Sequence, residues 1–220
     1  LRDLGVEPLS DPMLAVEPTG AIPLSDAEYT ILTSKTGAEL VAEAGFEPDS
    51  DGELVAIGTP TADAIERAGY AVDRIPSDFS SSGLLAELDG DAVGARVEVA
   101  RSDHGSAVLT DGLNEIGAYV HETVLYRLVR PPGAGASVTA AAGGELSGAC
   151  FTSSLTVEHF VEAAAERGVK SGAIAGLNEA VVGAIGEPTA ATADACGIEV
   201  DVVPTTAEFE ALAAAVVDRL

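Results

Sequence analysis

The sequence has no tryptophan, one methionine, two cysteines and two lysines, and aromatic residues make up only 4% of it. Because Cys150 and Cys196 are the only cysteines, a fold held together by disulfides is excluded, and we expect two free, mostly buried thiols. No apolar run approaches the roughly 20 residues that a helix needs to span a bilayer. Hydrophobic content is nevertheless 47% of 220 residues, enough for one large domain or two small ones.

Basic residues are scarce, and the formal charge is −25, from 36 acidic residues against 11 basic ones. A surface this acidic repels nucleic acid and anionic lipid, so we expect neither nucleic acid nor a membrane as a partner. Many acids, few lysines and many small apolar residues are the pattern expected of a halophilic cytoplasm, where salt screens the self-repulsion. An acidic interaction tail is the alternative, but the acids are spread along the whole chain.

The chain contains an internal repeat. Residues 56–76 read AIGTPTADAIERAGYAVDRIP and residues 184–204 read AIGEPTAATADACGIEVDVVP, at a constant offset of 128 residues. A second shared piece precedes each copy, YTILTS at 29–34 and GACFTS at 148–153. Two shared pieces in the same order indicate two related units.

Each unit alternates short apolar runs with helical patterns. Gly58-x-Pro60 and Gly186-x-Pro188 predict helix starts, and Gly69 and Gly197 predict the ends of the same helices. The expected strands are 31–33, 54–57, 71–75, 96–99, 120–129, 150–152, 181–185 and 198–203; helices are expected at 81–88, at 108–116 and after a Thr205-x-x-Glu208 capping box. We therefore expect an α/β fold of two related domains with parallel sheets flanked by helices.

Two connecting stretches rich in proline and glycine predict linkers at 18–20 and 129–132. Residues 21–128 then form an inserted α/β domain, and residues 1–17 join 133–220 in a discontinuous α/β domain. The chain would cross between the domains twice, which favours a ligand cleft between them.

Hydroxyl residues stand at four predicted helix starts, at Thr33-Ser34, Thr61, Thr152-Ser153 and Thr189. Helix N-termini carry a partial positive charge and bind carboxylates or phosphates without basic side chains. We therefore expect these residues to hold a polyanion. The alternative is that each serine or threonine only caps its own helix.

Motifs for several familiar chemistries are missing. Gly133-Ala134-Gly135 follows two prolines and no strand, so we interpret it as a linker rather than a dinucleotide loop. There is no Walker loop and no Gly-x-Ser-x-Gly elbow. His104, His121 and His159 lack zinc-type spacing, so we expect no metal and no cofactor.

Short motifs also follow one another in a characteristic order. They are LTS at 32–34, GTPTA at 58–62, a proline and a Ser-rich helix entry at 76–84, an Arg-led loop at 101–109, GA at 117–118, VLYR at 124–127, FTS at 151–153 and GEPTA at 186–190. In this order and spacing the chain resembles the uroporphyrinogen-III synthase family, over nearly its whole length.

The resemblance implies a cofactor-free cytoplasmic lyase of porphyrin biosynthesis, a monomer whose two α/β domains are joined by a two-stranded linker. Its substrate would be hydroxymethylbilane, a linear tetrapyrrole with eight carboxylates, which loses water and closes with ring D inverted. The substrate-binding residues would be Thr33, Ser34, Thr61, Arg101, Ser102, Thr152, Ser153 and Thr189.

Tyr126 matches the tyrosine of the family's V-x-Y motif and is the expected proton donor. A free phenol has a pKa of about 10 and therefore carries its proton at neutral pH. The alternative for this residue is packing at a domain edge.

Two departures from the family pattern affect these expectations. The family begins with a strand and helix that have no counterpart ahead of Leu1, so we expect the discontinuous domain to lack one strand. Glu187 stands at a helix start, where it either caps the helix or weakens anion binding. A two-lobed anion-binding or regulatory module without catalysis remains the alternative function.

The charge predicts a dependence on salt. At molar KCl the screening length falls to roughly 3 Å, which removes most repulsion between surface carboxylates. We expect cooperative unfolding and a high melting temperature above roughly molar salt, and partial unfolding in dilute buffer, as measured by circular dichroism. An unchanged melting temperature at about 50 mM salt would contradict the halophilic interpretation.

Overall fold

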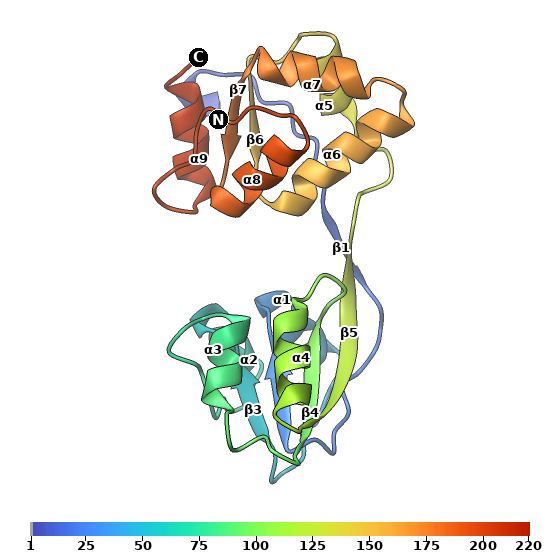
Figure 1. The fold of residues 1–220 in the computed structure, drawn as a ribbon, viewed down its shortest axis with the longest axis vertical. Coiled ribbons are helices and arrows are strands. Elements are labelled where there is room, and N and C mark those ends of the chain that lie inside the picture. Colours follow the sequence, from blue (N-terminus) through green and yellow to red (C-terminus); the bar gives the residue numbers. More distant parts are fainter. Residues whose placement is uncertain (1) are drawn as a thin grey trace. The chain divides into compact units, whose positions relative to one another are not determined.

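A computed structural model describes residues 2–220 and divides the chain into two compact units (Figure 1). The inserted unit is Val16–Leu128, and the discontinuous unit combines the residues up to Ala15 with Val129–Leu220. The chain passes from one unit to the other after Ala15 and after Leu128. No helix within residues 2–220 is both long and apolar enough to cross a membrane.

The inserted unit is built on a five-stranded sheet of order β1-β5-β4-β2-β3. Its strands are β1 (Ala15–Pro18), β2 (Tyr29–Leu32), β3 (Glu53–Ala56), β4 (Arg96–Ser102) and β5 (Tyr119–Val129). β2 runs parallel to β3 and β4, and β4 runs parallel to β5. The expectation of purely parallel sheets is wrong here, because β1 adds an edge strand that makes the sheet mixed. An edge strand tolerates Pro18, which in the sequence marks a connection.

Helices cover both faces of this sheet (Figure 1). α1 (Lys35–Glu43) and α2 (Thr59–Arg67) pack on the face that carries Leu32 and Ala100. α3 (Ser81–Glu87) and α4 (Ala107–Glu115) pack on the face that carries Ile31 and Val99. Successive strand residues point to opposite faces, so strands buried on both sides read as the continuous apolar runs seen in the sequence.

The discontinuous unit has a parallel pair of strands, β6 (Gly148–Phe151) and β7 (Val181–Ala184). Its helices are η1 (Arg2–Leu4), α5 (Ala136–Ala142), α6 (Ser154–Glu166), α7 (Lys170–Asn178), α8 (Glu187–Ala195) and α9 (Phe209–Val217). Figure 1 shows α9 and α6 on opposite sides of the strands. A Cβ at Gly183 would lie 2.5 Å from Val216 and 2.6 Å from Leu212, so glycine is what lets α9 approach β7.

Two expected strands are reduced to single bridges, from Val55 to Arg74 and from Gly183 to Val202. The strands predicted at 71–75 and 198–203 are therefore longer than those in the structure. An aspartate at the same place in each copy explains the difference. The carboxylates of Asp73 and Asp201 accept the N–H groups of Leu54 and Val182, each at 2.8 Å, which a longer strand would have paired.

The predicted capping box is also wrong, and one of the two alternatives given for Glu187 is excluded. The last helix begins after Glu208, which is its N-cap and makes no side-chain capping bond, so the Thr205 capping box does not form. Gly186 is the N-cap of α8, and Glu187 is the first helical residue rather than the cap. The predicted helix ends are confirmed, since Gly69 (φ +94°) and Gly197 (φ +84°) adopt the left-handed conformation that follows a helix.

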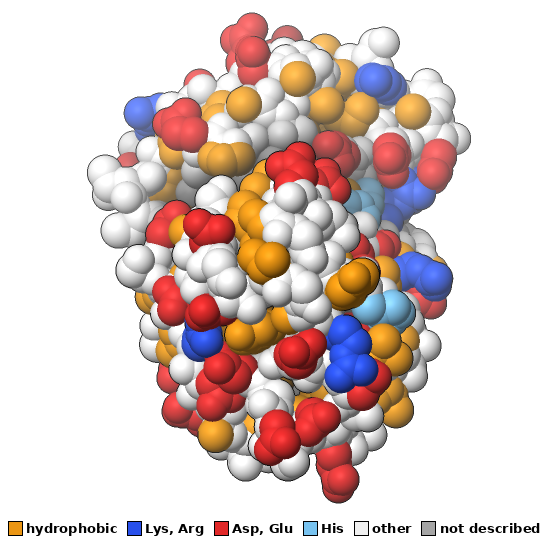
Figure 2. All heavy atoms as spheres, turned by 60° about the horizontal axis from the view of Figure 1, so that its bottom comes forward, with side chains coloured by type: hydrophobic (Ala, Val, Ile, Leu, Met, Phe, Trp, Pro, Cys, Tyr) orange, Lys and Arg blue, Asp and Glu red, His pale blue; other side chains and the backbone are white. Residues whose placement is uncertain are grey.

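Most arginine side chains lie against acids of their own unit. Arg74 contacts Glu53 and Asp91, and Arg96 lies 3.0 Å from Asp26. Figure 2 shows one face of the molecule, where acidic side chains far outnumber Lys and Arg. The few cations are thus used in internal ion pairs, and much of the negative charge stays exposed.

Asp11 ties the N-terminal segment to the discontinuous unit. Its carboxylate accepts the backbone N–H groups of Gly135 at 3.0 Å and Ser137 at 2.8 Å, and the Ser137 hydroxyl at 2.6 Å. Partial burial alone would raise the pKa of Asp11, but these hydrogen bonds and the nearby Arg167 lower it. The carboxylate therefore caps α5 across more than a hundred residues of sequence.

Replacing Asp11 by Asn is expected to destabilise the discontinuous unit by about 1–2 kcal/mol, as for loss of a helix cap. Because folding lowers the pKa, the carboxylate stabilises the fold above the ordinary carboxyl pKa. That contribution disappears as the pH falls through the lowered pKa. Urea unfolding at neutral and acidic pH measures both effects.

Asp194→Asn is the matched control, since it removes the same charge from the exposed surface of α8. A difference between Asp11→Asn and wild type that persists undiminished at acidic pH would contradict the assignment of the stabilisation to the carboxylate.

Candidate active site

The predicted site residues of the inserted unit gather at the carboxyl edge of its sheet. Thr33 and Ser34 follow β2, Thr61 lies in the first turn of α2 after β3, and Arg101 and Ser102 end β4. Tyr126 lies near the end of β5, paired with Ser102. Open α/β sheets bind ligands at this edge, because the helix N-termini that follow the strands collect there.

Tyr126 and Ser34 contact each other although 92 residues separate them. Tyr126 Oη donates to Ser34 Oγ at 3.0 Å, and Ser34, the N-cap of α1, accepts the N–H of Gly37 at 2.9 Å. A Cβ at Gly37 would lie 3.0 Å from Ser34 Oγ and 3.2 Å from Leu125, so glycine leaves room for this arrangement. The structure thus joins the expected proton donor to an expected substrate-binding residue.

A β-bulge directs Tyr126 toward α1. Val124 pairs with Arg101 and Tyr126 with Ser102, which leaves Leu125 as the extra residue. Leu125 and Tyr126 consequently belong to the same apolar cluster, and Tyr126 is only 7% exposed. Adjacent side chains of a regular strand point to opposite faces, but the bulge lets Leu125 and Tyr126 lie on the same face.

Asp103 holds the backbone from Tyr126 to Leu128. Its N–H donates to the carbonyl of Tyr126 at 3.2 Å, and its carboxylate accepts the N–H of Leu128 at 3.0 Å. Burial acts to raise the pKa of Asp103, but the hydrogen bonds from His104 and Leu128 outweigh it and lower the pKa. The sequence offered no sign of this role beyond the position of Asp103 in the Arg-led loop.

Arg101 is expected to bind the substrate, but its guanidinium is not a free cation. Its side chain is 5% exposed, donates to Glu122 at 2.7 Å and to the Ser106 carbonyl, and lies directly over Gly105. Its Nε is buried without a partner among the described residues. The guanidinium is therefore already neutralised by Glu122, and it orders the loop that leads into α4.

The two Gly-x-Pro-Thr helix starts bury their threonines alike, but an aromatic ring covers only one of them. Thr61 and Thr189 are only 3% and 4% exposed, so little of either hydroxyl is open to a ligand. The exposed ring of Phe79 covers the start of α2, since a Cβ at Gly58 would lie 3.0 Å from it. An anion at either terminus would contact backbone N–H groups rather than the threonine hydroxyls. Phe79 lies within the Ser-rich motif at 76–84, but the sequence did not single it out.

In the discontinuous unit the corresponding edge carries Thr152, Ser153 and Thr189. Ser153 caps α6 in a capping box with Thr156, while Thr152 is exposed. The Ser154 hydroxyl donates to the carbonyl of Pro188 at 3.2 Å, which places the starts of α6 and α8 side by side. This edge therefore repeats the helix termini of the inserted unit, but no tyrosine bonds to its capping serine within the described residues.

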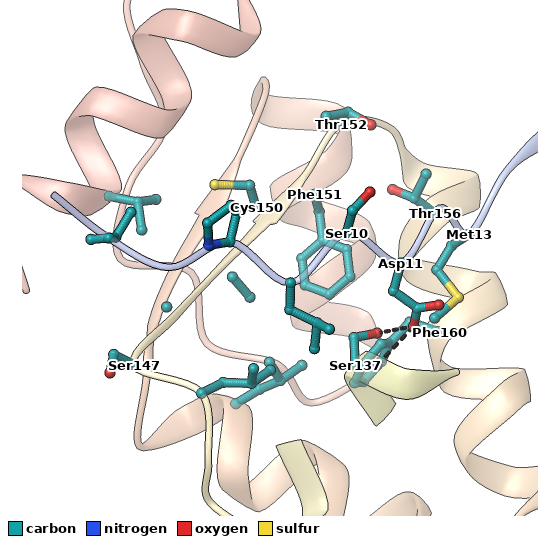
Figure 3. A pocket seen from close by; sticks show the side chains of 18 of the residues that line it. Ser10, Asp11, Met13, Ser137, Ser147, Cys150, Phe151, Thr152, Thr156 and Phe160 are labelled. Atoms are coloured by element: carbon teal, nitrogen blue, oxygen red, sulfur yellow. Dashed lines mark hydrogen bonds between the residues drawn. The ribbon is translucent and has the colours of Figure 1, made fainter. Parts of the chain in front are cut away.

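A cavity of about 700 Å³ lies beside β6 in the discontinuous unit (Figure 3). Figure 3 shows Asp11, bonded to Ser137, on one side and Cys150 and Phe151 on the other. Burial raises the pKa of the Cys150 thiol, so the thiol stays protonated at neutral pH. Thr152 is the one predicted site residue in the lining.

This cavity is poorly suited to the substrate's carboxylates. The Asp11 carboxylate would repel them, and exposed apolar side chains, including Leu9, Phe209 and Leu220, form much of the wall. Within residues 2–220, β6 pairs only with β7, whereas its repeat counterpart β2 lies between β3 and β4. The cavity occupies the place beside β6 that β4 fills beside β2, and we leave it out of the candidate active site.

The described residues offer little to hold a metal. Within residues 2–220, no three His, Cys, Asp or Glu side chains are grouped so that they could bind an ion. The chemistry available at the candidate site is that of hydroxyls, one phenol and backbone N–H groups.

Comparisons with known proteins bear on the family and the fold of this chain. In a curated collection, a putative uroporphyrinogen-III synthase from Methanothermobacter thermautotrophicus is 31% identical over 148 residues, 64% of this chain and 58% of that protein. The match therefore spans less than two thirds of that relative's length.

Two crystal structures share the fold. A mutant uroporphyrinogen III synthase from the extremely thermophilic bacterium Thermus thermophilus is 22% identical, with a TM-score of 0.64, covering 90% of this chain and 83% of that one. Uroporphyrinogen-III synthetase from Helicobacter pylori is 16% identical, with a TM-score of 0.63, covering 94% and 91%.

The family model described as uroporphyrinogen-III synthase HemD matches residues 1–214, nearly the whole sequence. Its extent includes both copies of the repeat and every residue of the candidate site. The chain belongs to the uroporphyrinogen-III synthase HemD family.

Proposed function

We propose that this protein is a uroporphyrinogen-III synthase, a hydro-lyase that closes hydroxymethylbilane with inversion of ring D. The product would enter tetrapyrrole biosynthesis toward haem, sirohaem or cobalamin. Beyond family membership, one observation carries the proposal: the single tyrosine of the VLYR motif is bonded to a helix-capping serine at the carboxyl edge of the sheet.

Eight carboxylates must be held by a protein whose charge is −25. The helix N-termini after β2, β3, β6 and β7 offer unpaired N–H groups and partial positive charge to such a ligand. We assign the contacts to Thr33, Ser34, Ser102, Thr152, Ser153 and the backbone around Thr61 and Thr189. Arg101 contributes by ordering its loop, because Glu122 already pairs with its guanidinium.

The reaction requires that the two ends of the substrate be positioned and that the leaving hydroxyl be protonated. The protein holds the ends of the linear tetrapyrrole near each other, which replaces a costly conformational search by binding. Proton donation to the hydroxyl lets it leave as water, after which the last ring attacks the electrophilic carbon. Tyr126 is the residue that we assign as the source of this proton.

We further infer that residues 18–20 and 129–132 form a two-stranded linker. It joins the discontinuous domain, made of residues 1–17 and 133–220, to the inserted domain, residues 21–128. We infer that the enzyme is a monomer in a salt-rich cytoplasm. Its acidic surface supports the salt-rich setting, since salt screens the repulsion among its carboxylates.

Coupling the protein to hydroxymethylbilane synthase in high salt tests the proposed function. After oxidation the porphyrin isomers are separated, and we expect mainly isomer III. A reaction without the protein supplies the spontaneous product, isomer I. If the protein also gives isomer I alone, the anion-binding or regulatory alternative stands instead.

The way the substrate is held predicts a contrast between two variants. Ser153→Leu blocks the start of α6 and should raise KM about ten-fold, the effect of one lost charged hydrogen bond. Arg127→Ala removes an exposed cation and should change KM by less than about two-fold. Initial rates against substrate concentration measure both values. A larger rise in KM for Arg127→Ala would contradict binding by helix termini.

A further inference from the structure

The hydroxyl oxygen of Ser34 accepts two hydrogen bonds. Gly37 N donates from α1 at 2.9 Å, and Tyr126 Oη donates from β5 at 3.0 Å. A serine hydroxyl has two lone pairs and one proton, so these donors occupy both lone pairs. None of the hydrogen bonds found within residues 2–220 gives the Ser34 proton an acceptor. That proton is directed away from both donors.

Burial separates the two hydroxyls. Tyr126 is 7% exposed and packs in the apolar cluster that includes Leu125 and Ala38. Ser34 is only half-buried and stands where α1 begins. The proton of Tyr126 is already donated to Ser34, so a ligand at the carboxyl edge meets the serine proton first.

We propose, on the basis of the proposed function, that Ser34 delivers the proton to the leaving hydroxyl and that Tyr126 replaces that proton. As the C–O bond of the hydroxymethyl group breaks, the Ser34 proton moves to the departing oxygen and forms water. The Tyr126 proton moves to Ser34 Oγ at the same time and leaves a phenolate. The phenolate regains a proton from the pyrrole carbon that loses its hydrogen when the ring closes.

The repeat supports a specific role for this pair. Ser153 is the counterpart of Ser34, but its hydroxyl accepts only the N–H of Thr156 and no phenol lies behind it among the described residues. The second copy thus keeps the cap without the proton supply. One proton-donating copy suits a substrate with a single leaving hydroxyl, while both copies remain suited to binding carboxylates.

The test compares Ser34→Gly, Tyr126→Phe and the double variant. Glycine is a good N-cap, so Ser34→Gly removes the hydroxyl at a cost of only a few tenths of a kcal/mol in helix stability. Ser34→Thr restores a hydroxyl and serves as the rescue variant. Ser80→Gly is the matched control, because Ser80 caps α3 through the same bond to the third helical residue, at 3.0 Å, without a tyrosine.

We expect kcat to fall about 10²-fold in Ser34→Gly and in Tyr126→Phe, the low end of general acid catalysis. The double variant should lose no more than either single variant, because the two groups act as one unit. KM of Tyr126→Phe should stay within about two-fold, the product should remain isomer III, and Ser34→Thr should recover most of the rate. Ser80→Gly should match wild type in kcat.

A Ser34→Gly enzyme with wild-type kcat, beside a slow Tyr126→Phe enzyme, would show that Tyr126 donates directly. Losses that multiply in the double variant would also overturn the proposal. Equal losses of kcat in Ser80→Gly and Ser34→Gly would show that Ser34 acts only as a helix cap. Wild-type protein that yields isomer I alone would refute the proposed function itself, an outcome distinct from these three.

Discussion

The first N–H groups of a helix have no acceptor within that helix, and this constraint shapes both units of the protein. Parallel strands bring the starts of α1 and α2 to one edge, and those of α6 and α8 to another. Ser34 and Ser153 satisfy some of these groups, and Gly58 and Gly186 leave others free. A chain with few cations thereby gains positive potential from its backbone.

The scarcity of cations makes this use of the backbone necessary. Arg74, Arg101 and Arg130 each lie against a carboxylate of their own unit, at Glu53, Glu122 and Glu166. Such pairs fix loops and strand ends, but they leave little positive charge for a ligand. The N-caps of α2 and α8 make no side-chain capping bond, so the positive potential at these helix starts persists in a protein of high negative charge.

The internal repeat made much of the fold predictable from sequence. It located β2, β3, β6 and β7 and the helices that follow them, because glycine and proline recur where the backbone needs them. The prediction failed where a side chain took over a backbone bond, as Asp73 and Asp201 do at the shortened strands. The capping box at Thr205 failed because a local motif cannot reveal where a helix begins when packing decides it.

Long-range contacts at the candidate site were beyond sequence reasoning. Asp11 caps a helix more than a hundred residues away, and Arg101 meets Glu122 on the neighbouring strand. The hydrogen bond from Tyr126 to Ser34 depends on a bulge at Leu125, and no residue in that stretch is typical of a bulge. Sequence therefore supplied the candidate residues, while strand register and the bulge decide which of them meet.

Duplication gave the protein two similar edges, and later differences made them unequal. One copy carries the phenol behind its capping serine and an aromatic ring over the neighbouring helix start. The other keeps a capping box and an open helix start, with Glu187 in its first turn. A carboxylate there competes with an anionic ligand for the same N–H groups. Under the proposed function, the first copy would hold the reacting end of the substrate, and the second would make weaker contacts with its carboxylates.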